Sequence, residues 1–125
     1  MTDRLLTDAE LELMSVLWAH GPCTAREAMA ALPEGRAYTT VSTILRILVD
    51  KGFASAEPQG RAHVYGALVS RTDYRVRKLR SVVDGLFDGS ALDLVRQLVR
   101  SEDLSASERD ALRSFVEDLD DGSGE

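Results

Sequence analysis

Between residues 38 and 51 the sequence gathers hydroxyl side chains and one arginine on what would be a single helical face. At 100° per residue, Thr39, Ser42, Thr43, Arg46 and Asp50 fall within about 100° of arc. An ordinary solvated helix face is usually built from Glu, Lys and Gln, because Thr and Ser are weaker helix formers. Selection for something other than helix stability is therefore indicated. Hydroxyls beside an arginine suit the phosphates and base edges of a DNA groove.

Each of these side chains also has a simpler role open to it. Arg46 can pair with O6 and N7 of a guanine, hold a phosphate, or stay in solvent. Thr39, Thr40 and Thr43 can contact phosphates, bases or the thymine methyl, or can serve in capping and β-branched packing. Tyr38 and Thr39 lie near the expected helix start, where backbone N–H groups favour a phosphate in either case.

Other reactive side chains are few and isolated, which argues against catalysis and metal binding. Cys23 is the only cysteine, so the chain holds no internal disulfide and no thiolate metal cluster. Its place before a helix start suits a redox sensor with a lowered pKa, or simply a small residue at that point. His20 and His63 are too few for a metal site. We expect no enzyme activity, no metal and no cofactor, since no nucleophile with a base is suggested by spacing.

Three capping-box signatures indicate the helices that position the polar face. They lie at residues 7–10, 24–27 and 105–108, each with Ser or Thr followed three residues later by Glu. Apolar residues at helical spacing follow the first two boxes and recur in the polar-faced segment. The expected inward positions are Leu11, Met14, Leu17 and Trp18 in the first helix, Ala25, Ala28, Met29 and Leu32 in the second, and Val41, Ile44, Leu45 and Leu48 in the third.

Two short runs around a Pro/Gly turn follow the third helix and predict a β-hairpin. The runs are residues 53–57 and 62–65, with the turn at residues 58–61. Alternation places His63 on the same face as Arg61 and Tyr65, where it either packs in the hairpin or bonds a phosphate. Three helices and a hairpin are typical of a winged helix-turn-helix, with residues 38–51 as the DNA-reading helix. The expected DNA-binding residues are Thr24, Arg26, Arg36, Tyr38, Thr39, Thr40, Ser42, Thr43, Arg46, Arg61 and His63.

The charge distribution allows this interpretation without requiring it. The chain carries a formal net charge of −6, which is not typical of a nucleic-acid binder. Residues 36–80 nevertheless hold nine Lys or Arg against three acids, a local charge of +6. Screening limits the reach of a charge to about 10 Å, so the local value matters more. Two hypotheses follow: a sequence-specific DNA reader, or a winged-helix module whose acidic surface binds another protein.

From residue 72 the pattern changes to helices alone, whose apolar stripes lack a partner within the segment. About 50 residues of short helices have too little bulk for a firm core, and a second copy is the simplest cover. We predict a mainly α-helical fold with a small β-hairpin wing: a winged helix-turn-helix domain at residues 1–71 and a helical dimerisation domain with an acidic tail at residues 72–125. The predicted dimerisation residues are Val76, Leu79, Val83, Leu86, Phe87, Leu92, Val95, Leu98, Leu112, Phe115 and Val116.

The composition, with 44% hydrophobic and 29% charged residues, is that of a folded globular chain. No apolar run approaches the roughly 20 residues that span a bilayer. The first twelve residues are too acidic for a signal peptide. We expect a cytoplasmic location and no membrane partner.

Four stretches carry a specific motif set: residues 9–18 (AELELMSVLW), residues 37–52 (AYTTVSTILRILVDKG), the wing ending in Tyr65, and residues 86–90 (LFDGS). On these residues the chain resembles the penicillinase and methicillin-resistance repressor family, of the BlaI and MecI type with the copper-responsive CopY branch. The resemblance implies a homodimer whose winged-helix heads bind a palindromic DNA operator and block transcription.

The resemblance also implies proteolysis by a regulatory protease, downstream of a membrane sensor, in the branch that responds to β-lactam antibiotics. The matching position lies around Gln97 and Leu98, but the family's Asn before an aromatic residue is absent here, so cleavage stays open. The copper branch's cysteine cluster is absent from residues 118–125, which excludes copper sensing by that route. Ile47 stands where the family often has a second basic residue after Arg46.

Overall fold

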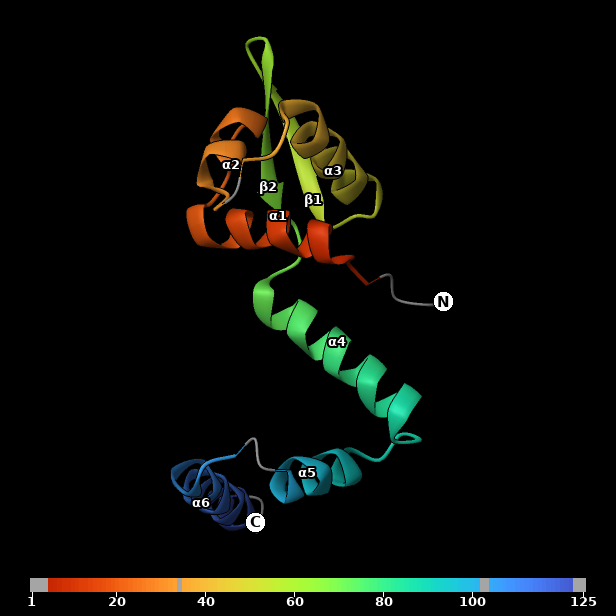
Figure 1. Cartoon of the computed structure of the whole chain (residues 1–125), viewed down its shortest axis with the longest axis vertical. Helices are drawn as coiled ribbons and strands as arrows, with labels where there is room; N and C mark the ends of the chain where they lie inside the picture. The colour runs from red at the N-terminus through yellow and green to blue at the C-terminus, as the bar shows by residue number, and fades with distance from the viewer. Residues whose placement is uncertain (1–4, 34, 102–103, 123–125) are drawn as a thin grey trace. The chain divides into compact units, whose positions relative to one another are not determined.

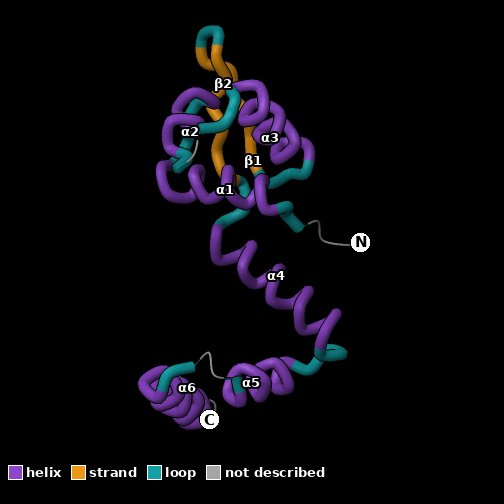
Figure 2. The backbone as a smooth tube through the Cα atoms, in the orientation of Figure 1, coloured by secondary structure: helices purple, strands orange, loops and turns teal. Residues whose placement is uncertain are grey.

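Figure 1 shows the computed structural model, which describes residues 5–33, 35–101 and 104–122. The chain forms two compact units, Met1–Leu79 and Arg80–Glu125. Its described part consists of helices and one two-stranded antiparallel hairpin (Figure 2), which confirms the mainly α-helical fold with a wing. Among the described residues, no helix has the length and apolar character needed to cross a membrane.

The first unit begins with three helices, α1 (Asp8–His20), α2 (Ala25–Ala31) and α3 (Tyr38–Asp50). The capping boxes predicted for α1 and α2 are confirmed. The hydroxyls of Thr7 and Thr24 accept from the backbone N–H of Glu10 and Glu27, whose carboxylates accept from the threonine N–H in return. Each box thereby satisfies backbone donors that a helix start leaves unpaired.

The core of this unit lies where α3 packs against α1, α2 and β1 (Ala54–Gln59). The inward positions predicted for α3 are all buried, and so are Ala25, Ala28 and Leu32 around α2. The largest fully buried side chains of the unit are Phe53, Leu13, Met14, Leu45, Leu48 and Val41.

The predicted inward face of α1 is wrong at one position. Leu11 is 36% exposed, whereas Leu13 and Leu17 are almost fully buried. The buried arc of α1 also includes the carboxylate residue Glu10, which is 6% exposed. The predicted face left out Leu13 and Val16, which the structure buries beside Met14 and Leu17.

The wing is formed by β1 and β2 (Ala62–Ala67), and its turn consists of Gly60 and Arg61 alone. Gly60 has φ +64°, a conformation that two-residue hairpin turns require and that glycine adopts without strain. The predicted four-residue turn is therefore too long, since Pro58 lies within β1 opposite His63. Proline is tolerated there because an outer strand has one side without ladder hydrogen bonds.

A short bridge ties the wing to the helices. Cys23, between α1 and α2, donates its N–H to the Tyr65 carbonyl at 3.0 Å and accepts from the Tyr65 N–H at 2.8 Å. Tyr65 itself is 8% exposed. The middle of β2 is thereby bonded to the segment that leads into α2.

The next helix, α4 (Arg71–Leu86), begins in the first unit. Tyr74 is 4% exposed, and its ring centroid lies 5.8 Å from that of Phe53 and 6.1 Å from that of Trp18. The Trp18 indole N–H donates to the Val69 carbonyl at 2.8 Å. The boundary that we placed after residue 71 falls at the start of this packed helix, and the compact unit itself runs to Leu79.

The second unit contains the end of α4, α5 (Ala91–Arg100) and α6 (Ala106–Gly122). The third capping box is confirmed by the reciprocal hydrogen bonds of Ser105 and Glu108. The Arg109 guanidinium donates to the Val99 carbonyl at 2.8 Å and to the Ser101 carbonyl at 3.2 Å. This arginine therefore links the end of α5 to the first turn of α6.

Most of the side chains predicted to form a dimer interface are exposed in the single chain. Val83, Phe87 and Leu112 are half-buried. The exposed ones are Val76, Leu79, Leu86, Leu92, Val95, Leu98, Phe115 and Val116.

Candidate nucleic-acid interface

The outer face of α3 carries the polar stripe expected from the sequence. Ser42 is half-buried, and Thr39, Thr43, Arg46 and Asp50 are exposed, as are Tyr38 and Thr40 at the start of the helix. The helix has Ala37 at its N-cap and no side-chain capping bond, so a capping role for Thr39 is wrong. Within the described residues, the Thr and Ser hydroxyls of the stripe and the Arg46 guanidinium have no hydrogen-bond or ion-pair partner. Their donors and acceptors are available to a ligand.

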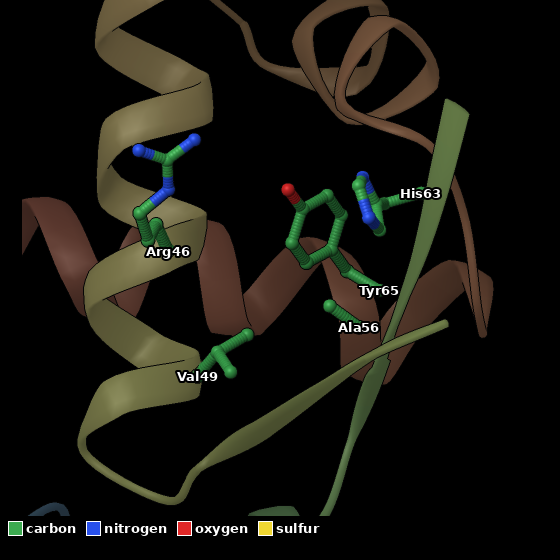
Figure 3. Close-up of a pocket in the computed structure, with 5 residues that line it drawn as sticks. All are labelled: Arg46, Val49, Ala56, His63 and Tyr65. Carbon is green, nitrogen blue, oxygen red and sulfur yellow. The ribbon is translucent and has the colours of Figure 1, made fainter. Parts of the chain in front are cut away.

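Arg46 and the wing line a common pocket. In Figure 3, Arg46 and Val49 rise from α3, while Ala56, His63 and Tyr65 face them from the hairpin. The ring centroids of His63 and Tyr65 lie 6.5 Å apart, which confirms that they share a face. Guanidinium, imidazole and phenol groups all donate hydrogen bonds to phosphate oxygens or base acceptors.

The start of α2 adds a second cation beside α3. The guanidinium carbon of Arg26 lies 4.9 Å from the ring centroid of Tyr38, a geometry in which the ring face attracts the charge. Thr24 caps the same helix, with its hydroxyl oxygen accepting from the Glu27 N–H at 3.2 Å. The Thr24 hydroxyl hydrogen remains available as a donor. Both predicted residues therefore lie at the N-terminal end of α2.

The tip of the wing presents Arg61. This residue forms the turn together with Gly60 and is exposed. Figure 1 shows the tip projecting beyond the ends of α2 and α3. A cation at this position can reach a phosphate that the helices cannot.

Arg36 has a protein partner that the sequence analysis missed. One of its terminal nitrogens lies 2.6 Å from Glu12 Oε1, with side-chain exposures of 36% and 32%. Arg36 stands two residues before α3, so this pair holds the segment that leads into α3 against α1. The guanidinium carries five N–H donors and can still bond a phosphate.

The opposite end of α3 is held by a second pair that was missed. Lys51 Nζ lies 2.6 Å from Glu10 Oε1, and side-chain exposures are 18% and 8%. Burial raises the pKa of Glu10, but the bonds from Lys51 and Thr7 more than offset it, so the net pKa is lowered. The two partners are 41 residues apart, so no spacing rule could have found them. Through Glu10 and Glu12, α1 fixes both ends of α3.

Cys23 is 7% exposed. Burial raises the pKa of its thiol, and the nearby Glu27 carboxylate raises it further. Because a raised pKa leaves little thiolate, the structure favours a small packing residue over a redox sensor. In the part of the chain that the structure describes, no three His, Cys, Asp or Glu side chains gather to hold a metal ion.

Three helices, a wing packed behind the third helix, and an unpartnered polar face on that helix define a winged helix-turn-helix protein. In this class the third helix, called the recognition helix, enters the major groove, which is about 12 Å wide and admits one helix. The chain belongs to the penicillinase repressor family, whose sequence model matches residues 6–118. This confirms the resemblance drawn from the motifs.

Named relatives cover most of the chain. It is 28% identical over 115 residues to the penicillinase repressor of Bacillus licheniformis, with 90% of each chain covered. It is 25% identical over 113 residues to the methicillin resistance regulatory protein MecI of Mammaliicoccus sciuri, covering 89% of this chain and 92% of that one. Among solved structures, the DNA binding domain of the repressor BlaI matches with 30% identity and a TM-score of 0.52, covering 59% of this chain and 92% of that domain.

Proposed function

We propose that this protein, a DNA-binding transcriptional repressor by its family, acts as a homodimer on a palindromic operator. Each α3 enters the major groove of one half-site, and each wing contacts the adjacent backbone or minor groove. The single observation that carries this proposal is the outer face of α3: among the described residues its hydroxyls and Arg46 have no protein partner, and Arg46 also lines the pocket beside the wing. Because the named relatives are repressors of bacteria, whose DNA lies in the cytoplasm, we place its action there.

The described surface supports a division between base reading and phosphate binding. Arg46 and Thr43 lie in the middle of α3, where side chains reach base edges. Thr39 and Thr40 lie in its first turn, and Thr24 and Arg26 at the start of α2, where the helix ends favour phosphates. Arg36, Tyr38 and Ser42 complete the α3 side of the surface, and Arg61 and His63 belong to the wing.

Dimerisation is proposed from the apolar side chains that the single chain leaves exposed. Leu86 is 76% exposed, and Leu92 and Phe115 are each 59% exposed. Large apolar groups exposed over several helices usually mark an interface. A second copy covers them in a closed, two-fold symmetric assembly, and two-fold symmetry in the protein matches a palindrome in the operator.

Release from DNA by proteolysis is a further part of the proposal. Gln97 and Leu98 lie in α5 and are exposed, and cleavage there would separate α6 from the rest of the apolar surface. A specific protease site inserted between Gln97 and Leu98 should, once cut, weaken operator binding. Unchanged affinity after complete cutting would refute this part of the proposal.

A second candidate is a winged-helix module that binds another protein, and the net charge of −6 favours it. Selection of bound duplexes from a random library separates the two candidates. The repressor should enrich a palindrome whose half-site centres lie about 10 base pairs, or a multiple of this, apart. Absence of enrichment above a protein-free control would favour the protein-binding module.

A further inference from the structure

The segment just before α1 is bonded to α3 at one residue and to α4 at the next. The Leu5 carbonyl accepts from Lys51 Nζ at 3.3 Å. Lys51 is the C-cap residue of α3 and also forms the partly buried ion pair with Glu10. Residue 5 is therefore attached directly to the end of the recognition helix.

The following residue is attached to α4. The Leu6 N–H donates to the Tyr74 hydroxyl at 3.0 Å, and both residues are buried, at 7% and 4% exposure. Their positions are 68 residues apart in the chain. A buried N–H needs a partner, so this bond fixes the segment against the first turn of α4.

Residue 7 then fixes the segment to α1. The Thr7 N–H donates to Glu10 Oε1 at 3.0 Å, the same oxygen that Lys51 contacts. We call residues 5–7 the strap. Its three successive residues each offer one backbone atom to a different helix, and all the side chains that hold it lie in the first compact unit.

We propose that the strap fixes the recognition helix relative to the start of α4, with Lys51 and Tyr74 as the positioning residues. This inference rests on the proposed function, in which α4 leads from the DNA-reading unit toward the apolar surface that joins two copies. Two recognition helices match a palindrome only if each keeps a set orientation to the element that connects it to its partner. Binding to a single half-site does not require this fixed orientation, because only one recognition helix contacts the DNA.

The test uses full-length Lys51→Met, Tyr74→Phe and the double variant, each measured on the selected palindromic operator and on a duplex carrying one half-site. Tyr74→Phe removes one hydroxyl and keeps the ring that packs on Phe53 and Trp18, so this variant keeps the test available if Lys51→Met is unstable. Lys78→Met is the matched control, because Lys78 is exposed on α4 and has no ion pair among the described residues.

Each strap variant should reduce the affinity advantage of the palindrome over the half-site by about tenfold, within the usual range of coupling between sites. Half-site affinity should stay unchanged, and Lys78→Met should retain the advantage. The double variant should lose little more than the larger single effect, since both changes interrupt one connection.

Other results overturn the inference. Equal losses on both duplexes would show that Lys51 and Tyr74 only stabilise the fold, and an unchanged advantage would show that the strap is not required. Additive losses in the double variant would mean two independent contacts. If the wild-type protein itself does not prefer the palindrome, the proposed function fails, and that outcome is distinct from a failure of the strap alone.

Discussion

The guanidinium of Arg36 lies 2.6 Å from the carboxylate of Glu12, so a cation expected on the DNA-binding surface is already paired with an acid of α1. The pair is partly exposed, and ion pairs of this kind contribute at most about 1 kcal/mol to stability. Its larger effect is on the charge that the surface shows to DNA. Glu12 holds Arg36 in place and also cancels part of its attraction for phosphate.

Glu12→Gln should therefore strengthen DNA binding. We expect a gain of about two- to fivefold at low salt, because the freed guanidinium binds phosphate and releases counterions. The free energy of unfolding should fall by less than about 1 kcal/mol. Fluorescence anisotropy on a duplex measures the first effect. Glu117→Gln, the same charge change on exposed α6, is the control, and an equal gain there would show that only net charge matters.

Arg46→Ala should weaken operator binding by about 1–3 kcal/mol and relax the preference at one base pair per half-site. The reason is its place on the exposed centre of α3 beside the wing pocket. Competition with duplexes substituted at each operator position measures the effect. A uniform loss over all sequences would assign Arg46 to a phosphate, and Arg100→Ala on α5 should bind as the wild type does.

Leu79→Asp should dissociate the proposed dimer, because Leu79 is 53% exposed on the apolar face of α4 and a buried unpaired charge at an interface is costly. Sedimentation equilibrium at tens of micromolar should show a monomer, and operator affinity should fall with it. Ser81→Asp introduces the same charge on another side of α4 and should stay dimeric. A dimeric Leu79→Asp variant would mean that the interface lies elsewhere.

Glu10 should make stability depend on pH in the acid range. Its pKa is lowered in the folded chain, so its contribution is complete above the ordinary glutamate value of about 4.3 and is lost as the pH falls through the lower folded value. Glu10→Gln should cost about 1–3 kcal/mol at neutral pH, since Lys51 loses its buried partner. Urea titrations of both proteins between pH 7 and pH 3 should show this difference shrinking toward acid. A difference that grows toward acid would contradict the assignment.

Local signals in the sequence were sufficient to predict the helices and the hairpin. Each capping box uses two residues three positions apart, so Thr7, Thr24 and Ser105 predict the helix starts without information from the rest of the chain. The inward face of α3 follows equally from spacing, because one side of the helix is apolar and the other is polar. The wing was found from its turn, although Pro58 was misplaced since β1 tolerates a proline.

Contacts between distant residues could not be predicted. Spacing identifies Glu10 as the acid of a capping box, but no local signal predicts that it is buried beside Lys51. The sequence likewise gives no sign that the Tyr74 hydroxyl accepts from the Leu6 N–H, because the two residues are 68 positions apart. These bonds depend on how the helices pack, and that packing cannot be derived from local patterns in a single sequence.

The central claim, a dimer that reads DNA through α3 and the wing, is tested most directly by titrating the selected operator over a salt series. A dimer that touches about 6–10 phosphates should give a log–log slope of affinity against salt of roughly −5 to −9. The half-site duplex should give about half that slope. A slope near zero, or equal slopes for operator and half-site, would contradict the account.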